Sequence, residues 1–486
     1  MDERSPNRWM VKTIRRVTGR APVATVESSA RQRAAAPIAV APGRLPVLGH
    51  LVPLMRDPLG FMASLPAHGD LVGIGLGPMT AVVICDLELT RQVLRQDRIF
   101  DKGGPLFDSG RELVGEGLAT CPHAKHRRQR RLLQPAFHAK RLTGYTPVMA
   151  QKIAELVDSW PDGQVVDVKA ELHTFAARVI AATLFDQAIS EVTQERLLHD
   201  VEAVFAGAMR HAIVPEWMRR WPIVGNRACI DAAAEARAIL GELVAARRAA
   251  GDDRGDLFSA LVFAQDSQGG GQLTEGEIVD QVLTFFFAGT DTSAATLAWA
   301  LILLDRHPEF AARVYAEVDT VLAGRPAVSA DLPSLQFTGQ VIDEVLRLHP
   351  PGWLQTRTVT EDTELGGHSL VAGTTVIYSS YLIQHRADLY PDPERFDPDR
   401  FAPDRGTPPA RDAMLPFAAG ARKCIGDTFA LAEATLALAT IAARWQLHTV
   451  PGTDTSPTLA VVPQPRQLRM QVTARAPQTT RTSSTA

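Results

Sequence analysis

Cys424 lies in the segment Phe417-Ala-Ala-Gly-Ala-Arg-Lys-Cys424-Ile-Gly426, which is followed at once by the helical run DTFALAEATLALATIAARW. A sulfur just before a helix N-terminus faces unpaired backbone N–H groups and the positive end of the helix dipole, and both favour a thiolate. The dipole contributes only about 0.3–2 kcal/mol, so it cannot by itself hold a buried charge, whereas a metal ion bound to the sulfur can. Gly420 and Gly426 let the backbone approach a bulky planar group, and Phe417 can shield the sulfur. The segment therefore indicates haem-thiolate ligation by Cys424; the alternative is an ordinary buried cysteine.

A second chemical pattern interrupts a long helix predicted over 274–306, where Ala288-Gly-Thr-Asp291-Thr292-Ser293 follows three phenylalanines. A glycine inside a helix costs about 1 kcal/mol relative to alanine, and a buried unpaired carboxylate is also costly, so a purely structural helix rarely carries both. The small residues at 288 and 289 leave room for a diatomic ligand over a haem face. The Asp291 carboxylate and the Thr292 hydroxyl can relay protons to it, and Thr292 can also bond to a carbonyl of its own helix.

A third pattern pairs opposite charges. Glu344 and Arg347 stand three residues apart on a helix predicted over 336–348, so their side chains can meet. Pro393-Glu394-Arg395-Phe396 supplies a further guanidinium. On an exposed helix such a pair contributes little, but a buried network of Glu344, Arg347 and Arg395 would cost about 3–5 kcal/mol to break.

In this order, the three segments resemble the cytochrome P450 family of haem-thiolate monooxygenases, whose patterns F-x-x-G-x-R-x-C-x-G, A/G-G-x-D-T and E-x-x-R they match. The resemblance implies that Cys424 is the axial ligand of the iron in haem b and that Asp291 and Thr292 serve oxygen activation. It also implies a structural triad behind the sulfur loop, formed by Glu344, Arg347 and Arg395. Four basic side chains are expected to hold the haem propionates: His126, Arg130, Arg357 and Arg422.

The chain departs from the family patterns at three positions. Ala418 stands where a glycine is frequent and Ser293 where a threonine is frequent, and we expect both small residues to change little. His126 stands where many members have tryptophan, which bears only on the strength of that propionate contact.

The substrate pocket is expected on the face of the 274–306 helix that carries Thr292. Three- and four-residue steps place Thr284 and Ala288 on that face, with Phe287 at its margin. Trp353 and Leu354, just before Arg357, are expected on the far wall. A loop over 102–118 and helix ends near 206–224 are expected to form the lid. These residue types predict an apolar substrate.

Residues 100–137 are similar to bacterial sesquiterpene oxidases of the pentalenene oxygenase type, which implies a cyclic sesquiterpene substrate such as pentalenene. An apolar pocket discriminates one methylene by only about 1–3 kcal/mol, so a macrolide, a fatty acid or a steroid stays open. A haem-thiolate sensor or binding protein that does not activate O2 is a further alternative, although it would not need Asp291 and Thr292.

The elements that must position these groups are mainly helical. Apolar residues recur at three- and four-residue spacing over most of the chain, while strand patterns are confined to 71–76 with 80–85, 358–380 and 445–471. We predict a mainly α fold with small β-sheets, in which one large cytochrome P450-type domain over 42–471 surrounds a buried haem. Residues 1–41 and 472–486 are predicted to be a disordered leader and tail. The GxGxG pattern at 73–77 is followed by a strand pattern and not by a helix, so it predicts a hairpin and not a dinucleotide loop.

Charge and cysteine content limit the partners. A net charge of -3 gives no case for nucleic acid, and an uncharged apolar run of about 18 residues is missing, so no transmembrane anchor is expected. Four dispersed cysteines fit a reducing cytoplasm. The cluster Cys121, His123 and His126 lacks a nearby fourth ligand for zinc.

Electrons for O2 must be delivered to the haem. The chain continues for only 62 residues after Cys424, too few for a flavin or iron–sulfur domain. We therefore expect a separate ferredoxin and ferredoxin reductase as electron donors. Their docking face is predicted to be basic, formed by Arg128, Arg131, Lys140 and Lys423.

Overall fold

The computed structural model describes residues 37–185, 189–213, 226–266, 268–269, 271–403, 411–458 and 461–475. Most of the predicted leader (1–36), most of the predicted tail (476–486) and part of the predicted lid (214–224) lie outside these ranges.

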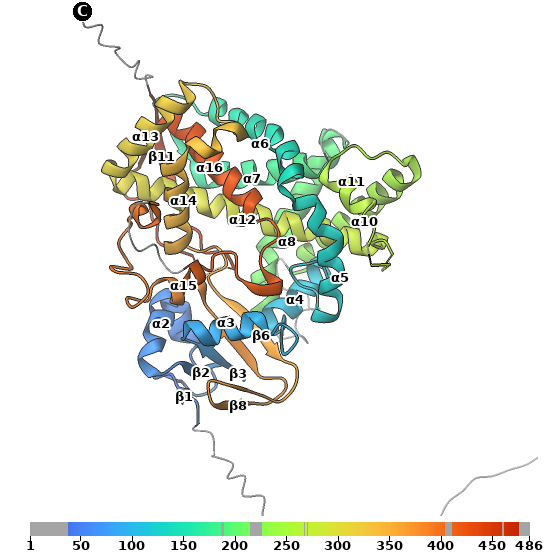
Figure 1. Cartoon of the computed structure of the whole chain (residues 1–486), viewed down its shortest axis with the longest axis vertical. Helices are drawn as coiled ribbons and strands as arrows, with labels where there is room; N and C mark the ends of the chain where they lie inside the picture. Colours follow the sequence, from blue (N-terminus) through green and yellow to red (C-terminus); the bar gives the residue numbers. More distant parts are fainter. Residues whose placement is uncertain are drawn as a thin grey trace, which may run out of the picture. The chain divides into compact units, whose positions relative to one another are not determined.

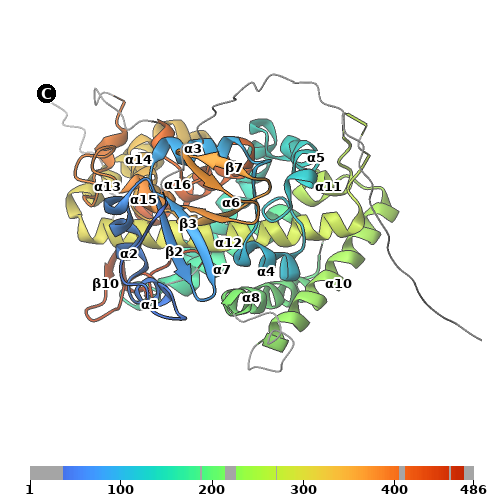
Figure 2. The same ribbon diagram turned by 90° about the horizontal axis from the view of Figure 1, so that it is seen from below.

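Helices form most of the described residues. The longest is α12 (Glu275–Arg306), which runs through the centre of the view in Figure 2 and begins with a capping box between Thr274 and Glu277. Of the described helices, α12 alone is long and apolar enough to cross a membrane, and 72% of its apolar window is buried inside the protein. The other long helices are α6 (Ala139–Ser159), α7 (Val168–Phe185), α8 (Glu191–Ile213), α10 (Asn226–Ala250), α13 (Pro308–Leu322), α14 (Gln336–Leu348) and α16 (Asp427–Arg444). The shorter helices are α1 (Leu51–Arg56), α2 (Pro58–Ser64), α3 (Leu87–Arg95), α4 (Pro105–Val114), α5 (His123–Leu133), α11 (Leu257–Val262) and α15 (Ser380–Gln384).

The strands form three sheets. The largest, in the lower part of Figure 1, has the order β1-β2-β3-β9-β6-β4, with β1 (Ala39–Val40), β2 (Leu71–Leu76), β3 (Met79–Ile84), β9 (Thr375–Tyr378), β6 (Gln355–Val359) and β4 (Phe100–Asp101). The second contains β10 (Trp445–Thr449), β11 (Arg469–Ala474) and β5 (Val165–Asp167), and the third pairs β7 (Thr363–Leu365) with β8 (His368–Leu370). The prediction of a mainly α fold with small sheets is therefore confirmed.

The GxGxG pattern forms the predicted hairpin. Strands β2 and β3 pair antiparallel from Leu71 opposite Ile84 to Leu76 opposite Met79, and Gly77 makes the turn with φ +64°. A helix does not follow this glycine-rich segment, so the backbone N–H groups there belong to the sheet.

Three boundaries differ from the sequence-based expectation. Ala39–Val40, predicted in the leader, pair in parallel with β2, and residues 472–474, predicted in the tail, pair with β10. The predicted 102–118 loop contains the helix α4. Pairing between segments far apart in sequence decides the first two, so local composition could not indicate them.

A buried ion-pair network fastens α14 to the chain that precedes the cysteine loop. Arg347 donates through Nε and Nη2 to the two carboxylate oxygens of Glu344, at 2.7 and 2.9 Å, and neither side chain is exposed. Glu344 Oε1 also accepts from the backbone N–H of Asp397 at 2.9 Å. Arg347 Nη1 donates to the carbonyl of Gln384, whose side-chain oxygen accepts from the backbone N–H of Leu415 at 2.8 Å.

The third guanidinium of this network belongs to Arg400, and the predicted role of Arg395 is wrong. Arg400 is buried with Nε 3.3 Å from Glu344 Oε1. The Arg395 side chain is exposed, and only its carbonyl takes part, by accepting from Arg347 Nη2 at 3.3 Å. The sequence contains Pro-acidic-Arg-Phe twice, at 393–396 and at 398–401. The path of the backbone decides which of the two arginines turns inward.

Replacing each arginine separately tests this assignment. We expect Arg400→Ala to lower the free energy of unfolding by about 3 kcal/mol, the low end for breaking a buried ion pair, because Glu344 keeps Arg347. Arg395→Ala is expected to stay within about 0.5 kcal/mol of the parent, as for an exposed side chain. Denaturant unfolding of the two variants measures both values, and equal losses would contradict the assignment.

Candidate active site

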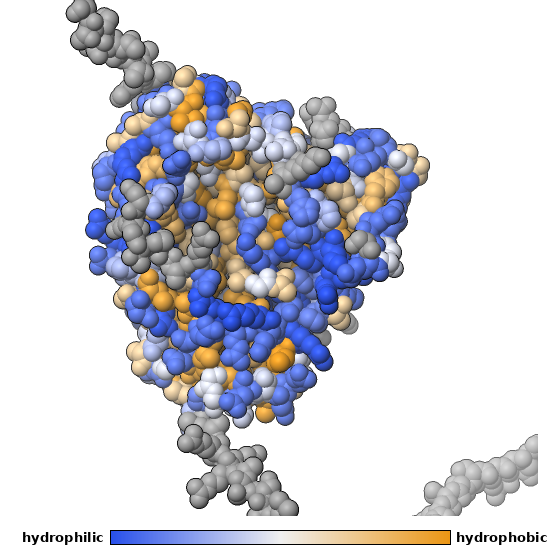
Figure 3. Space-filling model, in the orientation of Figure 1, coloured by the Kyte–Doolittle hydropathy of each residue, from blue (hydrophilic) through white to orange (hydrophobic). Residues whose placement is uncertain are grey.

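A cavity of about 770 Å³ lies between the helices and the largest sheet. Residues of α4, α5, α7 and α12 line it together with the segments around 351–355 and 416–434, and most of the lining is apolar. Cys424, Asp291 and Thr292, which lie on separate segments of the sequence, all face this one cavity. On the face shown in Figure 3, hydrophobic residues reach the surface in a central band with hydrophilic residues on both sides.

Cys424 stands at the end of a loop directly before α16. Its backbone N–H donates to the carbonyl of Phe417 at 2.9 Å, and its side chain is exposed because it faces the cavity. Desolvation by the surrounding protein raises the pKa of the Cys424 thiol. The backbone N–H of Gly426 and the positive charges of Arg130 and Lys102 lower this pKa. The backbone N–H of Gly426 and these two cations favour a negatively charged sulfur, which is the form that ligates a metal ion.

Two residues in this loop have the left-handed backbone conformation. Gly420 has φ +70°, and a Cβ atom there would lie 2.2 Å from the Leu94 carbonyl oxygen, so only glycine fits. Ala418 has φ +55°. A left-handed backbone costs an L-residue about 1–2 kcal/mol, so the alanine at 418 is not the neutral replacement that the sequence suggested.

Local hydrogen bonds shape α12 beside the cavity. Thr292 Oγ1 donates to the Ala288 carbonyl at 2.6 Å, and Thr296 Oγ1 donates to the Thr292 carbonyl at 2.8 Å. A Cβ atom on Gly289 would lie 2.5 Å from Ile180 Cδ1. Gly289 therefore lets α7 and α12 approach each other closely at this point.

Asp291 has two side-chain partners that the sequence did not indicate. His173 on α7 places Nε2 at 3.2 Å from Asp291 Oδ1, and Gln464 Nε2 donates to the same oxygen at 3.2 Å. All three residues line the cavity. A single histidine on a helix far away in sequence carries no motif, so no signal in the sequence could have found this contact.

The basic residues expected at the propionates converge from several elements. Arg357 is buried, donates to the Thr356 carbonyl and to the Tyr378 hydroxyl, and has no carboxylate partner among the described residues. Arg130 lines the cavity and donates to the Lys423 carbonyl at 2.6 Å.

Burial and positive neighbours change the pKa of two groups in this basic cluster. Burial, with Arg357 and Arg422 nearby, lowers the pKa of Lys102 to about 7. Burial, with Arg422 and Lys102 nearby, lowers the pKa of His126 to about 3, so its imidazole is neutral and can donate one N–H. A buried cluster of cations calls for an anionic partner. Lys102 is a cavity residue that the sequence analysis missed, although it lies within the segment on which the closer resemblance rests.

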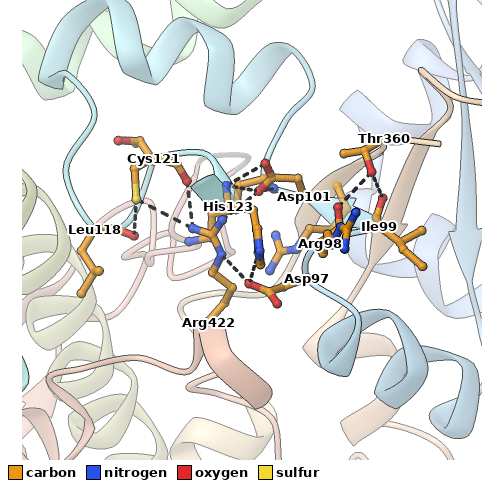
Figure 4. A network of polar contacts seen from close by, with 12 residues as sticks. Asp97, Arg98, Ile99, Asp101, Leu118, Cys121, His123, Thr360 and Arg422 are labelled. Atoms are coloured by element: carbon orange, nitrogen blue, oxygen red, sulfur yellow. Dashed lines mark hydrogen bonds and ion pairs between the residues drawn. The ribbon is translucent and has the colours of Figure 1, made fainter. Parts of the chain in front are cut away.

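Arg422 already has protein partners in this cluster. Figure 4 shows its guanidinium between three segments: Nη2 donates to Asp101 Oδ1 at 2.7 Å, Nη1 donates to the Cys121 carbonyl at 2.8 Å, and Nε lies 3.4 Å from Asp97 Oδ2. Arg422 therefore fastens the cysteine loop to β4 and to the start of α5 in addition to facing the cavity.

The three residues weighed as a zinc cluster point to different partners. His123 Nδ1 lies 3.0 Å from Asp97 Oδ2, and Cys121 Sγ lies 3.8 Å from the Leu118 carbonyl oxygen (Figure 4). His126 lines the cavity. Within the described ranges, histidine, cysteine and acidic side chains do not gather into a set of three that could hold a metal ion by themselves.

The cavity wall contains three of the five predicted pocket residues. Thr284, Phe287 and Ala288 line it, whereas Trp353 and Leu354 pack into the hydrophobic core of the largest sheet. Their neighbours Gly352 and Gln355 face the cavity instead. The path of the backbone between Gly352 and Gln355 therefore turns the two side chains between them into the core and not toward the cavity.

Ser293 on α12 and Glu433 on α16 form a buried contact in the wall of the cavity. Ser293 Oγ donates to Glu433 Oε2 at 2.6 Å, and the carboxyl group is fully buried. Glu433 Oε1 has no partner in the part of the chain that the structure describes. Burial raises the pKa of Glu433 to about 7, although the serine hydroxyl opposes this shift. The serine that replaces a frequent threonine thus has a specific partner, which the sequence analysis did not foresee.

The predicted docking residues are largely engaged within the chain. Arg128 pairs with Glu277, Arg131 with Asp266, and Lys423 with Asp427. The Lys140 side chain lies outside the described residues. These three cations are therefore partly neutralised by neighbouring carboxylates.

A thiol before a helix, a carboxylate and a hydroxyl on a facing helix, and a cluster of cations around one apolar cavity define a haem-thiolate enzyme. The family model for cytochrome P450 matches residues 40–471. A cyclooctat-9-en-7-ol 5-monooxygenase from Streptomyces melanosporofaciens is 44% identical over 435 residues, covering 89% of this chain and 95% of that protein. A pentalenene oxygenase from Streptomyces avermitilis is 45% identical over 438 residues, covering 90% and 97%. The crystal structure of the cytochrome P450DA haem domain matches with a TM-score of 0.81 and 27% identity, covering 92% of this chain and 99% of that one.

The chain belongs to the cytochrome P450 family and is a monooxygenase with a haem-thiolate cofactor. The residues present fit that cofactor. The Cys424 sulfur faces the cavity, and the cationic side chains of Lys102 and Arg130 line it. The buried Arg357 lies near Lys102 and has no carboxylate partner in the described chain, although it is not among the lining residues. When bound, the haem supplies the iron at which O2 is activated.

A glycine at 418 tests the strain in the cysteine loop. We expect Ala418→Gly to raise the free energy of unfolding by about 0.5–1 kcal/mol, because relief of the left-handed strain exceeds the extra entropy of an unfolded glycine. The matched control is Ala419→Gly, at an extended residue with φ -147°, where a loss of about 0.5–1 kcal/mol is expected. Denaturant unfolding gives both values, and the same sign for both would contradict the assigned strain.

The raised pKa of Glu433 predicts a dependence of stability on pH. An acid whose pKa is higher in the folded than in the unfolded state destabilises the fold as pH rises above the unfolded value. Between about pH 5.5 and pH 8 we expect the parent to lose roughly 2 kcal/mol relative to Glu433→Gln, from 1.36 kcal/mol per pKa unit. The exposed Glu364 supplies the control, Glu364→Gln, which should follow the parent. A pH-independent difference between Glu433→Gln and the parent would show that Glu433 is not buried as an acid.

Proposed function

We propose that this monooxygenase hydroxylates a cyclic sesquiterpene such as pentalenene, using haem b, O2 and electrons from a ferredoxin and its reductase. The observation that carries the proposal is the similarity, over about nine-tenths of the chain, to the pentalenene oxygenase and to the cyclooctat-9-en-7-ol 5-monooxygenase. The apolar cavity wall with Phe287 and Ala288 on α12 agrees with a hydrocarbon substrate.

A terpenoid that already carries a hydroxyl group is the second candidate substrate. Thr183 and Thr284 line the cavity, and both hydroxyl groups are buried without a partner in the described part of the chain. An unpaired buried hydroxyl is unfavourable, and a substrate hydroxyl would pair with it. This observation favours an alcohol of the kind named for the first relative.

In this proposal each cavity residue has one task. Cys424 ligates the iron, and Lys102, His126, Arg130 and Arg422 on the cavity wall face the propionates. The buried Arg357, which lies near Lys102 but is not among the lining residues, adds its charge to theirs. Asp291 and Thr292 hold and move the protons that O2 reduction consumes. The apolar wall positions the substrate and excludes water, which strengthens the polar interactions inside.

The electron donor and the location follow from the same proposal. A ferredoxin would bind near α5, where Arg127 is exposed and could add to the partly paired Arg128 and Arg131. We place the enzyme in the cytoplasm, where the four cysteines stay reduced.

Titration of the ferric protein with candidate substrates tests the proposal. We expect pentalenene to give a saturable low-spin to high-spin change in the Soret band, with an affinity at least tenfold above those of dodecanoic acid and testosterone. Cyclooctat-9-en-7-ol tests the second candidate in the same assay. Ala288→Phe, which fills the cavity beside α12, should abolish the change but keep the thiolate-type band of the carbon monoxide complex.

Each outcome of the titration has a definite reading. A response to dodecanoic acid or testosterone without a response to either terpenoid would overturn the substrate class. Hydroxylation is verified by mass spectrometry after turnover under isotopically labelled O2, because the product should then contain one labelled oxygen atom.

A further inference from the structure

His173 stands between solvent and the Asp291 carboxylate. The ring lies on α7 and is 26% exposed, with Nε2 at 3.2 Å from Asp291 Oδ1 on α12. On its other side, Nδ1 lies 3.9 Å from Oε1 of Glu202 on α8, a side chain that is 51% exposed. The imidazole therefore connects a solvated carboxylate at the surface with the carboxylate that faces the cavity.

The contacts of Asp291 leave one of its oxygens available. His173 and Gln464 both bind Oδ1. In the described part of the chain, Oδ2 has no protein partner and can exchange a proton with the cavity. A carboxylate held at one oxygen and open at the other can accept a proton on one side and release it on the other.

The charges that face His173 come from three helices. Asp291 on α12 and Glu202 on α8 are negative, and Lys169 on α7 is positive. The hydrogen bond with Asp291 is the largest influence and raises the pKa of His173 above its usual value, against the opposing effects of burial and Lys169. The ring is thus an imidazolium under conditions in which an isolated histidine begins to lose its proton.

We propose that His173 is the proton-supplying and positioning residue of Asp291, and that it sets the pH dependence of coupled turnover. The inference rests on the proposed role of Asp291. The Nε2–H bond of the imidazolium breaks, an O–H bond forms on the Asp291 carboxyl group, and the neutral ring takes a new proton from solvent. Two such protons accompany the two electrons from the donor as RH and O2 become ROH and water.

The sign of the pH effect follows from this order of events. Below its pKa the ring carries a proton to give, and above its pKa it does not. Coupled turnover should therefore fall as pH rises through the raised pKa of His173.

The first test compares two histidine variants in the complete enzyme. His173→Gln keeps a hydrogen-bond donor but cannot carry the charge. The control is His448→Gln, because His448 also pairs with an aspartate, Asp305 at 3.0 Å, but is exposed and does not line the cavity. For His173→Gln we expect at least a threefold loss of product per NADPH oxidised, a matching rise in peroxide and a flattened pH profile. The substrate-induced spin change should keep its affinity, and His448→Gln should behave as the parent.

The second test needs no substrate. In the ferrous carbon monoxide complex, the ring signals of isotope-labelled histidine give the pKa of His173, assigned by their loss in His173→Gln. We expect this pKa to fall in Asp291→Asn, because the negative partner is gone.

The two tests separate failure of this inference from failure of the proposed function. Unchanged coupling and pH profile in His173→Gln, or an unchanged His173 pKa in Asp291→Asn, would overturn the role of His173. If neither terpenoid is hydroxylated, two measurements still decide the role of His173. They are the NADPH consumption and peroxide formation without product, and the pKa of His173 in the parent and in Asp291→Asn.

Discussion

The structure depends on holding one sulfur, that of Cys424, at a fixed place facing the cavity. The loop that carries it, directly before α16, is held by interactions with other elements of the fold. The Glu344–Arg347 pair, joined by Arg400, ties α14 to the chain before that loop, and Arg422 ties the loop itself to β4. Breaking a buried ion pair is costly, so these contacts hold the chain on both sides of the sulfur firmly in the fold.

The charged groups on the two sides of the cavity are arranged differently. Around Arg357 and Lys102, positive groups gather with too few anions, which is the arrangement expected for binding an acidic cofactor. On α12, the Asp291 carboxylate that faces the cavity is paired with the titratable ring of His173. A fixed cation would hold that carboxylate permanently ionised, whereas an imidazolium can also hand over its proton.

Similarity to known relatives indicates the class of reaction more directly than it indicates the substrate. In the proposed function, Cys424 and Asp291 serve the activation of O2, while the buried Glu344–Arg347 network holds the fold and does not line the cavity. The cavity that would hold a substrate is lined by apolar side chains such as Phe287 and by the hydroxyls of Thr183 and Thr284, which have no partner among the described residues. Small changes in such a wall alter selectivity by only about 1–3 kcal/mol per methylene, so similar chains can act on different terpenoids.

The sequence by itself determined the groups whose neighbours are close along the chain: the thiol before α16, the hydroxyl of Thr292 bonded one turn back, the Glu344–Arg347 pair, and the periodicity of the helices. Only the tertiary structure decided between Arg395 and Arg400, turned Trp353 away from the cavity and brought His173 to Asp291. The physical reason is the distance along the chain over which each interaction acts. Helical spacing and capping act over a few residues, whereas these three outcomes depend on how segments far apart in sequence pack against each other.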